Sequence, residues 1–510
     1  MRFLKIFFSR FFYVFIAIIL QVLVLCATTF WLASYYRWVN YAFSVIAIIV
    51  FLVILNKNRP ASFKLPWIAI ILILPIFGIT LYGAFGNYNL SKKNRKKLEE
   101  ETKELKSYCL VNEDAFEQLK NTNENAYGQA RYIENTINLP VYKDCYIEYL
   151  STGEEFHAKL LEELSKAKKY IFMEYFIVEY GTMLDSIHEI LLKKAKEGVE
   201  IYFMYDDVGS ISKVRNGFFY DLRNEGINAC KFLPFKPLVS VIHNNRDHRK
   251  ITVIDGEVGF TGGINIADEY VNIKHPFGVW KDNAVLVKGK CVDSLIFMFI
   301  KLYNSSALKK IDPSKYLNNK HEIYENKSFI SLYGDGPSPT YQYYVGKNVY
   351  LNIINQAVKY LYITTPYLIM DYEFFEAIIN ASKRGVDVKI ITPHIPDKKV
   401  IYIMTKSNYQ NLIKEGVGIY EYKPGFIHAK MFVCDDKIAT VGTINLDYRS
   451  TVHHFECGAW IYNDDSILLM KQDFENIIKN DGVEINDKNG KLKVHERILK
   501  DILRMIAPLM

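Results

Sequence analysis

The chain has 510 residues, of which half are hydrophobic and 23% are charged, so most of it should fold around an apolar core. Its formal net charge of +7 suits an anionic partner such as a phospholipid or a nucleic acid, without choosing between them. Seven cysteines, an odd number, are scattered singly with no Cys-x-x-Cys pair, which argues against a disulfide framework and against a zinc site.

Three apolar runs open the chain, at Phe11–Tyr36, Tyr41–Leu55 and Trp67–Gly86. The first and the third are long enough to cross a bilayer, which takes roughly 20 residues. The second, at about 15 residues, could span with its flanks or form a re-entrant hairpin. A cleaved signal peptide would be a single short run before a small-residue cleavage site, so we predict a permanent transmembrane helical anchor over residues 1–90.

Basic residues flank these runs within 2–10, 57–64 and 91–97. The positive-inside rule would place all three basic groups in the cytoplasm, which three full crossings cannot satisfy. The conflict disappears if one run does not cross fully. We therefore expect a multi-pass protein of the cell membrane with its catalytic part in the cytoplasm, joined to the anchor by a basic helical linker over residues 91–138.

The rest of the chain reads as an internal duplication. The strand-like run Lys168–Gly181 resembles Val358–Asp371, and each follows a helical pattern. An amphipathic helix then ends at Gly198 in the first copy and at Gly385 in the second, and a strand follows each glycine. This alternation predicts an α/β fold, a pseudo-symmetric pair of α/β sandwich domains with mixed sheets covered by helices. We place these domains at residues 139–320 and 327–510.

Each copy carries His-x-Lys, then Asp, then Gly-x-x-Asn at identical spacing. The first copy reads DHRKITVIDGEVGFTGGIN and the second IHAKMFVCDDKIATVGTIN. At average composition, the His, Lys and Asp spacing alone arises by chance on the order of once in ten thousand starting points. Two copies on matching repeats make chance an inadequate explanation. The candidate catalytic residues are His248, Lys250 and Asp255 in the first copy and His428, Lys430 and Asp435 in the second.

Side chains alternate between the two faces of a strand, so the His and Lys of one copy should point the same way and the Asp the other way. Asp255 and Asp435 belong to the motif, but this parity predicts a structural role for them, holding either the turn after the strand or a buried partner. The return strand should bring Asn265 and Asn445 back beside the imidazoles. Each half then offers an imidazole, an ammonium group and an amide.

This inventory suits a phosphate diester. Lysine and asparagine can hold the non-bridging oxygens and stabilise the charge that develops on phosphorus. One imidazole can attack phosphorus, and the other can protonate the leaving alkoxide and then deprotonate the incoming alcohol. Because the two histidines have different tasks in one reaction, we predict that the two copies of the motif face each other across a single site.

A nucleophilic histidine needs its second ring nitrogen held by an acceptor. Asp282 lies in a strand-like run downstream of the first motif, and Glu456 lies in one downstream of the second. We predict that Asp282 orients His248 and that Glu456 orients His428.

Other residues could surround this site. His275 and His454 lie near the motifs in sequence and could line the site. Tyr175, Phe176 and Tyr367 end strands next to the expected cleft, where they could contact lipid chains. No pattern resembles a metal site, so the mechanism is expected to need neither a metal nor a cofactor.

With these motifs, the chain resembles the phospholipase D superfamily and, within it, the bacterial cardiolipin synthases. The segments that carry the resemblance are NNRDHRKITVIDG, GGINIADEY, VWKDN, GTINLDYRS and the apolar N-terminus. It implies transfer of a phosphatidyl group between two phosphatidylglycerol molecules through a phosphohistidine, which gives cardiolipin and glycerol. By position it implies His248 as the nucleophile and His428 as the acid and base. His454 stands where the family usually has Asn.

The alternatives keep this chemistry and change the acceptor. They are a hydrolytic phospholipase D and a phosphatidyltransferase that uses another alcohol, such as serine or phosphatidylethanolamine. A nuclease of the same superfamily has no need of three apolar runs, so the expected partners are phosphatidylglycerol and the membrane, with no nucleic acid. A non-enzymatic membrane scaffold is disfavoured because both motifs are intact.

Overall fold

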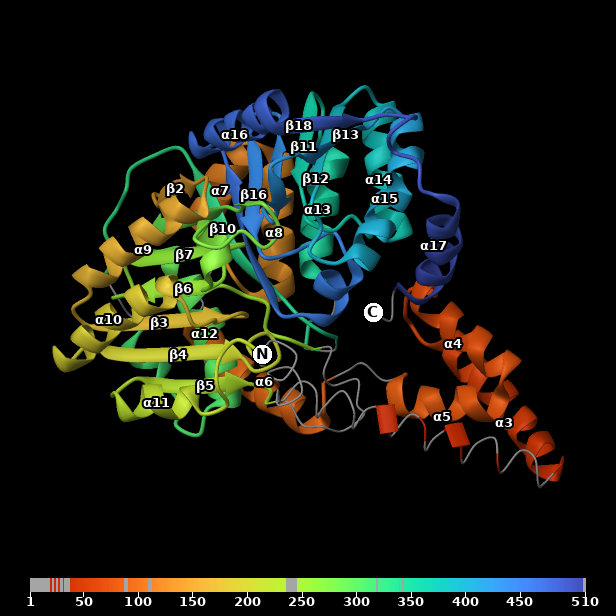
Figure 1. The fold of residues 1–510 in the computed structure, drawn as a ribbon. Coiled ribbons are helices and arrows are strands. Elements are labelled where there is room, and N and C mark those ends of the chain that lie inside the picture. Colours follow the sequence, from red (N-terminus) through yellow and green to blue (C-terminus); the bar gives the residue numbers. More distant parts are fainter. Residues whose placement is uncertain are drawn as a thin grey trace.

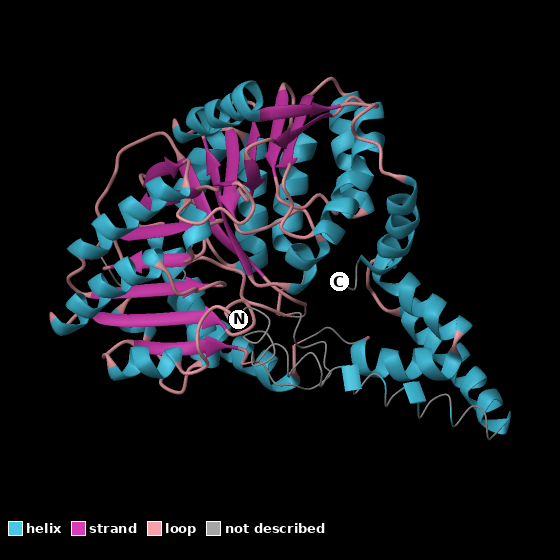
Figure 2. Cartoon of the chain, in the orientation of Figure 1, coloured by secondary structure: helices cyan, strands magenta, loops and turns pink. Residues whose placement is uncertain are grey.

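The computed structural model describes residues 37–86, 90–108, 112–234, 245–317, 320–338, 340–341 and 344–507, with a few isolated positions between 19 and 31. Within these residues the chain forms two mixed β-sheets whose faces are covered by helices. A helical lobe from the N-terminal part of the chain projects to one side (Figure 1, lower right). Figure 2 shows the two sheets as two separate sets of strands that meet near the centre of the molecule.

The first half contains a seven-stranded sheet in the order β2-β9-β7-β6-β3-β4-β5. Strand β3 pairs in parallel with β4, and β4 with β5, whereas the other neighbours are antiparallel. The strands are β2 (Tyr146–Leu150), β3 (Tyr170–Tyr175), β4 (Glu200–Asp206), β5 (Asn228–Phe232), β6 (Ile251–Ile254), β7 (Val258–Gly262) and β9 (Ala284–Lys288).

The second half contains a nine-stranded sheet in the order β1-β10-β17-β16-β15-β11-β12-β13-β18. Its strands are β1 (Tyr142–Lys143), β10 (Phe329–Asp335), β11 (Tyr360–Thr364), β12 (Asp387–Pro393), β13 (Gly418–Tyr422), β15 (Met431–Cys434), β16 (Ile438–Gly442), β17 (Glu456–Tyr462) and β18 (Gly482–Ile485). Its inner seven strands, β10 to β13, repeat the order of the first sheet. The predicted pair of α/β domains with mixed sheets is therefore confirmed.

Helices pack on both faces of each sheet. The first half contributes α9 (Gly153–Lys166), α10 (Thr182–Lys196), α11 (Phe218–Asn224) and α12 (Val292–Ser306). The second contributes α13 (Val345–Gln356), α14 (Tyr372–Lys383), α15 (Lys399–Lys414) and α16 (Ser466–Asp481), and α17 (Val494–Ile506) packs against α15. Short 3₁₀ turns lie at Asp268–Val271 and Pro313–Lys315, and a π-turn at Arg449–His453. Because helices cover both faces, the central strands β3 and β11 are buried at every position.

The sequence accounts for where the matching helices end. Helices α10 and α14 finish just before Gly198 and Gly385, whose φ angles are +89° and +90°. Glycine takes up this left-handed conformation without a Cβ clash and so terminates a helix cleanly. Both glycines were predicted to end a helix, and the structure shows them doing so.

The two halves share one apolar core. It joins buried residues of the linker helices to both sheets, with α12 buried along most of its length between them. The linker comprises α6 (Lys92–Leu105), a 3₁₀ turn (Lys106–Tyr108), α7 (Glu113–Thr122) and α8 (Glu124–Ile137). Strand β1 follows the linker and pairs with β10 of the second sheet. The chain therefore contributes a strand to the second sheet before it begins the first.

The N-terminal lobe consists of α3 (Arg37–Asn56), α4 (Ala61–Ile73) and α5 (Pro75–Phe85), packed around Trp67 and Ile71. The third apolar run was expected to be long enough for one span, but it forms two helices that meet at Leu74. Pro75 begins the second helix because proline cannot donate the backbone hydrogen bond that would continue the first.

Among the described residues, no helix has both the length and the apolar character that a membrane crossing requires. The first apolar run lies largely outside the described residues. Helix α17 lies beside α4 (Figure 1, right), so the last helix of the described chain contacts the N-terminal lobe.

Candidate active site

The two histidine motifs approach the centre of the molecule along the opposite half of the chain. Before His428, strand β14 (Gly425–Ile427) pairs in parallel with β8 (Val279–Lys281) of the first half. Before His248, Asp247 forms a parallel bridge with Phe455 of the second half. The backbone N–H of His248 donates to the carbonyl of Phe455 at 2.9 Å, and that of His428 to the carbonyl of Lys281 at 2.7 Å.

Each imidazole is hydrogen-bonded to a carboxylate of the other half. Nδ1 of His248 lies 2.9 Å from Oε2 of Glu456, and Nδ1 of His428 lies 2.7 Å from Oδ2 of Asp282. The predicted pairing, Asp282 with His248 and Glu456 with His428, is therefore wrong. The parallel register explains the exchange, because the residue after Lys281 must lie beside the residue after Ile427. Both carboxylates were found, but each serves the other motif.

A motif glycine makes room for one of these carboxylates. A Cβ atom on Gly263 would lie 2.0 Å from Oδ1 of Asp282, so a larger residue cannot stand there without moving the carboxylate. Thr443 occupies the equivalent position in the second half, and its hydroxyl donates a short hydrogen bond to Oε2 of Glu456. The two imidazole–carboxylate pairs thus have the same arrangement between the halves, but only Glu456 receives an additional hydrogen bond from the residue at this position.

The two lysines hold the backbone of their own motifs. Nζ of Lys250 donates to the carbonyl of His248 at 2.6 Å, and Nζ of Lys430 donates to that of His428. Burial lowers the pKa of Lys250 to about 8, although nearby Glu456 opposes the shift. Burial lowers the pKa of Lys430 to about 7, opposed by Asp282 and assisted by the charge of Lys250. The two motifs are therefore close enough for their ammonium groups to repel.

Both imidazoles are held neutral at neutral pH in this site. Burial lowers the pKa of His428 to about 4, with Lys430 contributing and Asp282 opposing. Burial, followed by the charges of Lys250 and Lys430, lowers the pKa of His248 well below its ordinary value. Because each Nδ1 faces a carboxylate, the neutral ring carries its proton there and leaves a lone pair on Nε2. A phosphate anion between the lysines would offset their charge and make protonation of one ring easier.

The two motif aspartates lie at the turns after β6 and β15. Asp255 accepts hydrogen bonds from the backbone N–H groups of residues 168, 169 and 170, where β3 begins. Asp435 accepts the same three bonds from residues 358, 359 and 360 at the start of β11. Both have a φ of +54°. These are the turn-holding positions that strand parity predicts, and neither carboxylate is bonded to an imidazole.

The motif asparagines are hydrogen-bonded within their own halves. Oδ1 of Asn265 accepts from the N–H of Ile177, and its amide donates to the hydroxyl of Tyr270 at 2.7 Å. The amide of Asn445 donates to the hydroxyl of Ser450 at 3.1 Å. Both side chains therefore brace the loop after the return strand. A second hydrogen of each amide is left for a phosphate oxygen, and that contact stays a prediction.

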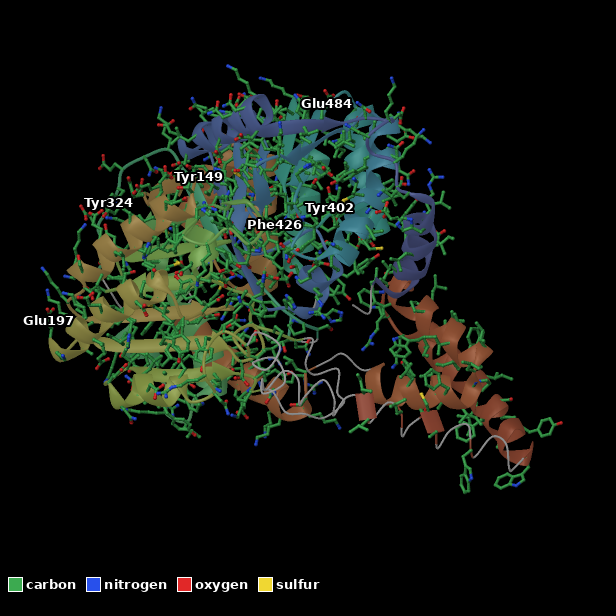
Figure 3. The ribbon with its side chains drawn as sticks, in the orientation of Figure 1. Tyr149, Glu197, Tyr324, Tyr402, Phe426 and Glu484 are labelled. Carbon is green, nitrogen blue, oxygen red and sulfur yellow. The ribbon has the colours of Figure 1, made fainter. Side chains whose placement is uncertain are left out.

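A buried ionic network supports the first motif and was missed from the sequence. Arg249 donates to Glu174 at 2.6 Å, and Arg246 lies 3.5 Å from Asp206. The second motif has Phe426 in place of Arg246, and Figure 3 shows this ring at the junction of the two halves. The available signal was an acidic residue at or next to the end of each of two largely apolar strands, Glu174 in YIFMEY and Asp206 in EIYFMYD.

Aromatic rings border both imidazoles. The rings of Phe176 and His454 lie 5.0 and 5.3 Å from that of His248, and Trp280 lies 5.3 Å from His428. His454 thus lines the site, as expected. His275 is exposed and forms no part of it. Tyr175 is buried with its hydroxyl 2.7 Å from that of Thr252, so its expected role beside the cleft is wrong.

One set of potential metal ligands was found among the described residues. Ligand atoms of His248, His454 and Glu456 all lie within 4.8 Å of one another. The His248–Glu456 hydrogen bond already occupies two of these residues, so an ion there would compete with the pairing that orients the imidazole.

Known proteins match this chain over most of its length. Residues 160–289 and 350–478 match the family described as "Cardiolipin synthase, PLD-like domain", and residues 45–87 match "Phospholipase_D-nuclease N-terminal". An uncharacterized protein of Streptococcus mutans is 40% identical over 90% of this chain and 99% of its own. A cardiolipin synthase of Halalkalibacterium halodurans is 30% identical over 97% of this chain and 99% of its own.

A solved structure shares the fold. The phosphatidylserine synthase of Haemophilus influenzae superposes with a TM-score of 0.57 at 16% identity, covering 75% of this chain and all of that one. At this identity the likeness concerns the arrangement of the two halves and says nothing about the substrate.

Proposed function

The chain belongs to the family of phospholipase-D-like cardiolipin synthases, and we propose on this ground that it is a phosphatidyltransferase that makes cardiolipin from phosphatidylglycerol. The observation that carries the proposal is the crossed arrangement of two imidazole–carboxylate pairs with two buried lysines between them. Such a site provides a nucleophile, a proton carrier and cationic stabilisation for one phosphodiester.

In the first proposed step, Nε2 of His248 attacks the phosphorus of one phosphatidylglycerol. The bond from phosphorus to the headgroup glycerol breaks, and the leaving alkoxide takes a proton from Nε2 of His428. Glycerol departs, and the phosphatidyl group remains on His248. Lys250 and Lys430 offset the charge on the non-bridging oxygens throughout, with help from Asn265 and Asn445.

In the second step, His428 takes the proton of a headgroup hydroxyl from a second phosphatidylglycerol. The resulting alkoxide attacks phosphorus, the P–N bond to His248 breaks, and cardiolipin leaves. Glu456 and Asp282 hold the two rings in the tautomer that both steps need. The assignment of attack to His248 follows the family resemblance, since the hydrogen bonds of the two histidines are equivalent.

The proposal includes the membrane. We propose that residues 1–90 attach the chain to the cell membrane and that the catalytic halves face the cytoplasm, where the substrate lipid is within reach of the site. The match of residues 45–87 to the N-terminal family segment and the apolar character of α3 to α5 support attachment.

The test uses the full-length chain with vesicles of phosphatidylglycerol and mass spectrometry of the products. Cardiolipin and free glycerol in equal amounts support the proposal. Phosphatidic acid with no cardiolipin would show a hydrolase, and absence of both products would contradict an enzymatic function. His248→Ala and His428→Ala should each abolish product. After a rapid quench, a phosphatidyl group on a peptide containing His248 would identify the nucleophile.

A further inference from the structure

The pseudo-symmetry of the site breaks in the loop after the motif asparagine. In the first half, Tyr270 receives the amide of Asn265 and closes over His428, with ring centroids 5.5 Å apart. In the second half, Ser450 takes the corresponding position and receives the amide of Asn445. A hydroxymethyl group thus replaces a tyrosine ring at this position.

The same loop differs in charge. Ala267 and Glu269 of the first half correspond to Asp447 and Arg449 of the second. The guanidinium group of Arg449 makes no hydrogen bond or ion pair with any other residue for which the structure gives a position. Lys398, at the start of α15, is 63% exposed and contacts Asp397 at 3.0 Å. Two cations, Lys398 and Arg449, therefore gather with the carboxylates of Asp397 and Asp447 on one side of an otherwise symmetric site.

These groups line a cleft of about 440 Å³. Its polar end carries Lys398, Asp447 and Arg449, and its walls are the apolar side chains of Ile369, Ile401 and Met404. A second cleft of about 400 Å³ shares Ile369 and Met404 and continues to the beginning of α4 at residues 60–62. The two adjoining clefts therefore lead from Lys398 and Arg449 to the N-terminal lobe. Leu503 and Ala507 pack against Met404, so α17 forms part of the wall.

Charged groups at the polar end of this cleft are close enough to the histidine site to influence the pKa values of its residues. Burial is the largest cause of the lowered pKa of His248, and the charge of Lys398 is a smaller one. Asp447 is likewise among the charges that oppose the lowered pKa of Lys430. Tyr367, also in the cleft, lies 6.3 Å from Phe426, whose ring stacks on His428 at 5.9 Å.

We propose that this cleft binds the acceptor phosphatidylglycerol, with Lys398 and Arg449 holding the acceptor's own phosphate and Asp447 accepting a hydrogen bond from its glycerol. This rests on the proposed function, in which a second anionic lipid must present a hydroxyl to the phosphatidyl-histidine. A carboxylate repels phosphate and accepts hydrogen bonds from hydroxyls, so Asp447 would turn the glycerol end of the headgroup towards His428. The apolar walls would take part of an acyl chain.

Two reactions of the full-length chain separate this acceptor role from the chemistry common to both lipids. Cardiolipin formation needs a donor and a lipid acceptor. Exchange of deuterated glycerol into phosphatidylglycerol needs the same donor and the same histidines, but its acceptor has no phosphate. Both are measured by mass spectrometry in the same vesicles.

The double variant Lys398→Ala with Arg449→Ala should lower the ratio of cardiolipin formation to glycerol exchange at least about tenfold, the usual effect of losing charged hydrogen bonds. Lys399→Ala, which removes the neighbouring exposed lysine outside the cleft, is the matched control and should leave the ratio unchanged. Ile401→Trp, which obstructs the apolar part, should lower the ratio as well.

An unchanged ratio in the double variant would overturn the proposal, whether both rates fall together or neither falls. A wild-type chain that exchanges glycerol and forms no cardiolipin would instead contradict the proposed function, and with it the acceptor cleft.

Discussion

Glu456 accepts a hydrogen bond from a histidine that stands 208 positions earlier in the chain, with 2.9 Å between Oε2 and Nδ1 of His248. The reciprocal bond joins His428 to Asp282 across 146 positions at 2.7 Å. Because these bonds cross between the halves, the orientation of each motif imidazole depends on how the two halves pack together.

The first prediction concerns the two carboxylates. Glu456→Gln and Asp282→Asn should each lower kcat for cardiolipin formation about 100-fold or more, because an amide can present its NH₂ group to Nδ1 and favour the wrong tautomer. Initial rates at saturating phosphatidylglycerol give the measurement. Glu484→Gln, on the exposed face of β18, is the control and should have no effect. Full activity in either buried variant would exclude the proposed role of these pairs.

The pH dependence should follow Lys430. Its pKa of about 7, against an ordinary value of 10.5, means that the free enzyme loses this charge as the pH rises through 7. The acid form of His428, with a pKa of about 4, already becomes scarcer as the pH rises, so the value of kcat/KM should decrease more steeply above pH 7, where Lys430 also loses its charge. Lys430→Arg keeps its charge and should move this alkaline limit upward by roughly two pH units, even if its maximum rate is lower. An alkaline limit that stays in place would show that another group controls it.

The same shift has a consequence for stability. Between about pH 7 and 10.5 the unfolded chain binds more protons at Lys430 than the folded chain does, so this residue makes unfolding less favourable as the pH rises. Lys430→Met should remove that part of the pH dependence. Urea unfolding of the wild type and of this variant at pH 7 and pH 9 would detect the difference.

Asp255 should matter for folding more than for catalysis. Asp255→Ala leaves three backbone N–H groups at the start of β3 without their acceptor, which we expect to lower the free energy of unfolding by about 2 kcal/mol. Asp255→Asn keeps one acceptor oxygen and should cost less. Activity per folded molecule should stay within about threefold of the wild type, because the carboxylate contacts neither imidazole. A large loss of kcat in a fully folded variant would contradict this.

Gly263→Ala tests the packing around Asp282. The added Cβ would lie 2.0 Å from a carboxylate oxygen, so Asp282 must move and release His428. We expect kcat to fall with little change in secondary structure by circular dichroism. Gly128→Ala is a suitable control, since its Cβ would meet no atom within 4 Å. Equal activity in the two variants would show that Asp282 can shift at no cost.

Much of the fold was accessible from the sequence because both halves repeat local signals. Short repeating patterns of apolar residues occur in both copies. They mark the helices that end at Gly198 and Gly385 and the buried strands beside the motifs. The turn-holding positions of Asp255 and Asp435 also follow from local strand parity.

The partner of each histidine was not accessible in this way. Nearness in sequence favoured Asp282 for His248, whereas the parallel pairing of β8 with β14 is a contact between halves with no local signal. Strand β1 has only two residues and left no pattern. The helix break at Pro75 has a local cause in proline, but the apolar run Trp67–Gly86 was interpreted by its length alone.

Neither half of this protein contains both members of either imidazole–carboxylate pair. A polypeptide comprising one half would have to associate with a second copy to bring its motif imidazole to the carboxylate that orients it. Joining both halves in one chain fixes their ratio at one to one and allows their sequences to differ. The Gly263/Thr443 and Tyr270/Ser450 pairs are positions where they do differ. Co-expressed fragments cut in the connection between the halves should therefore regain turnover only by complementation.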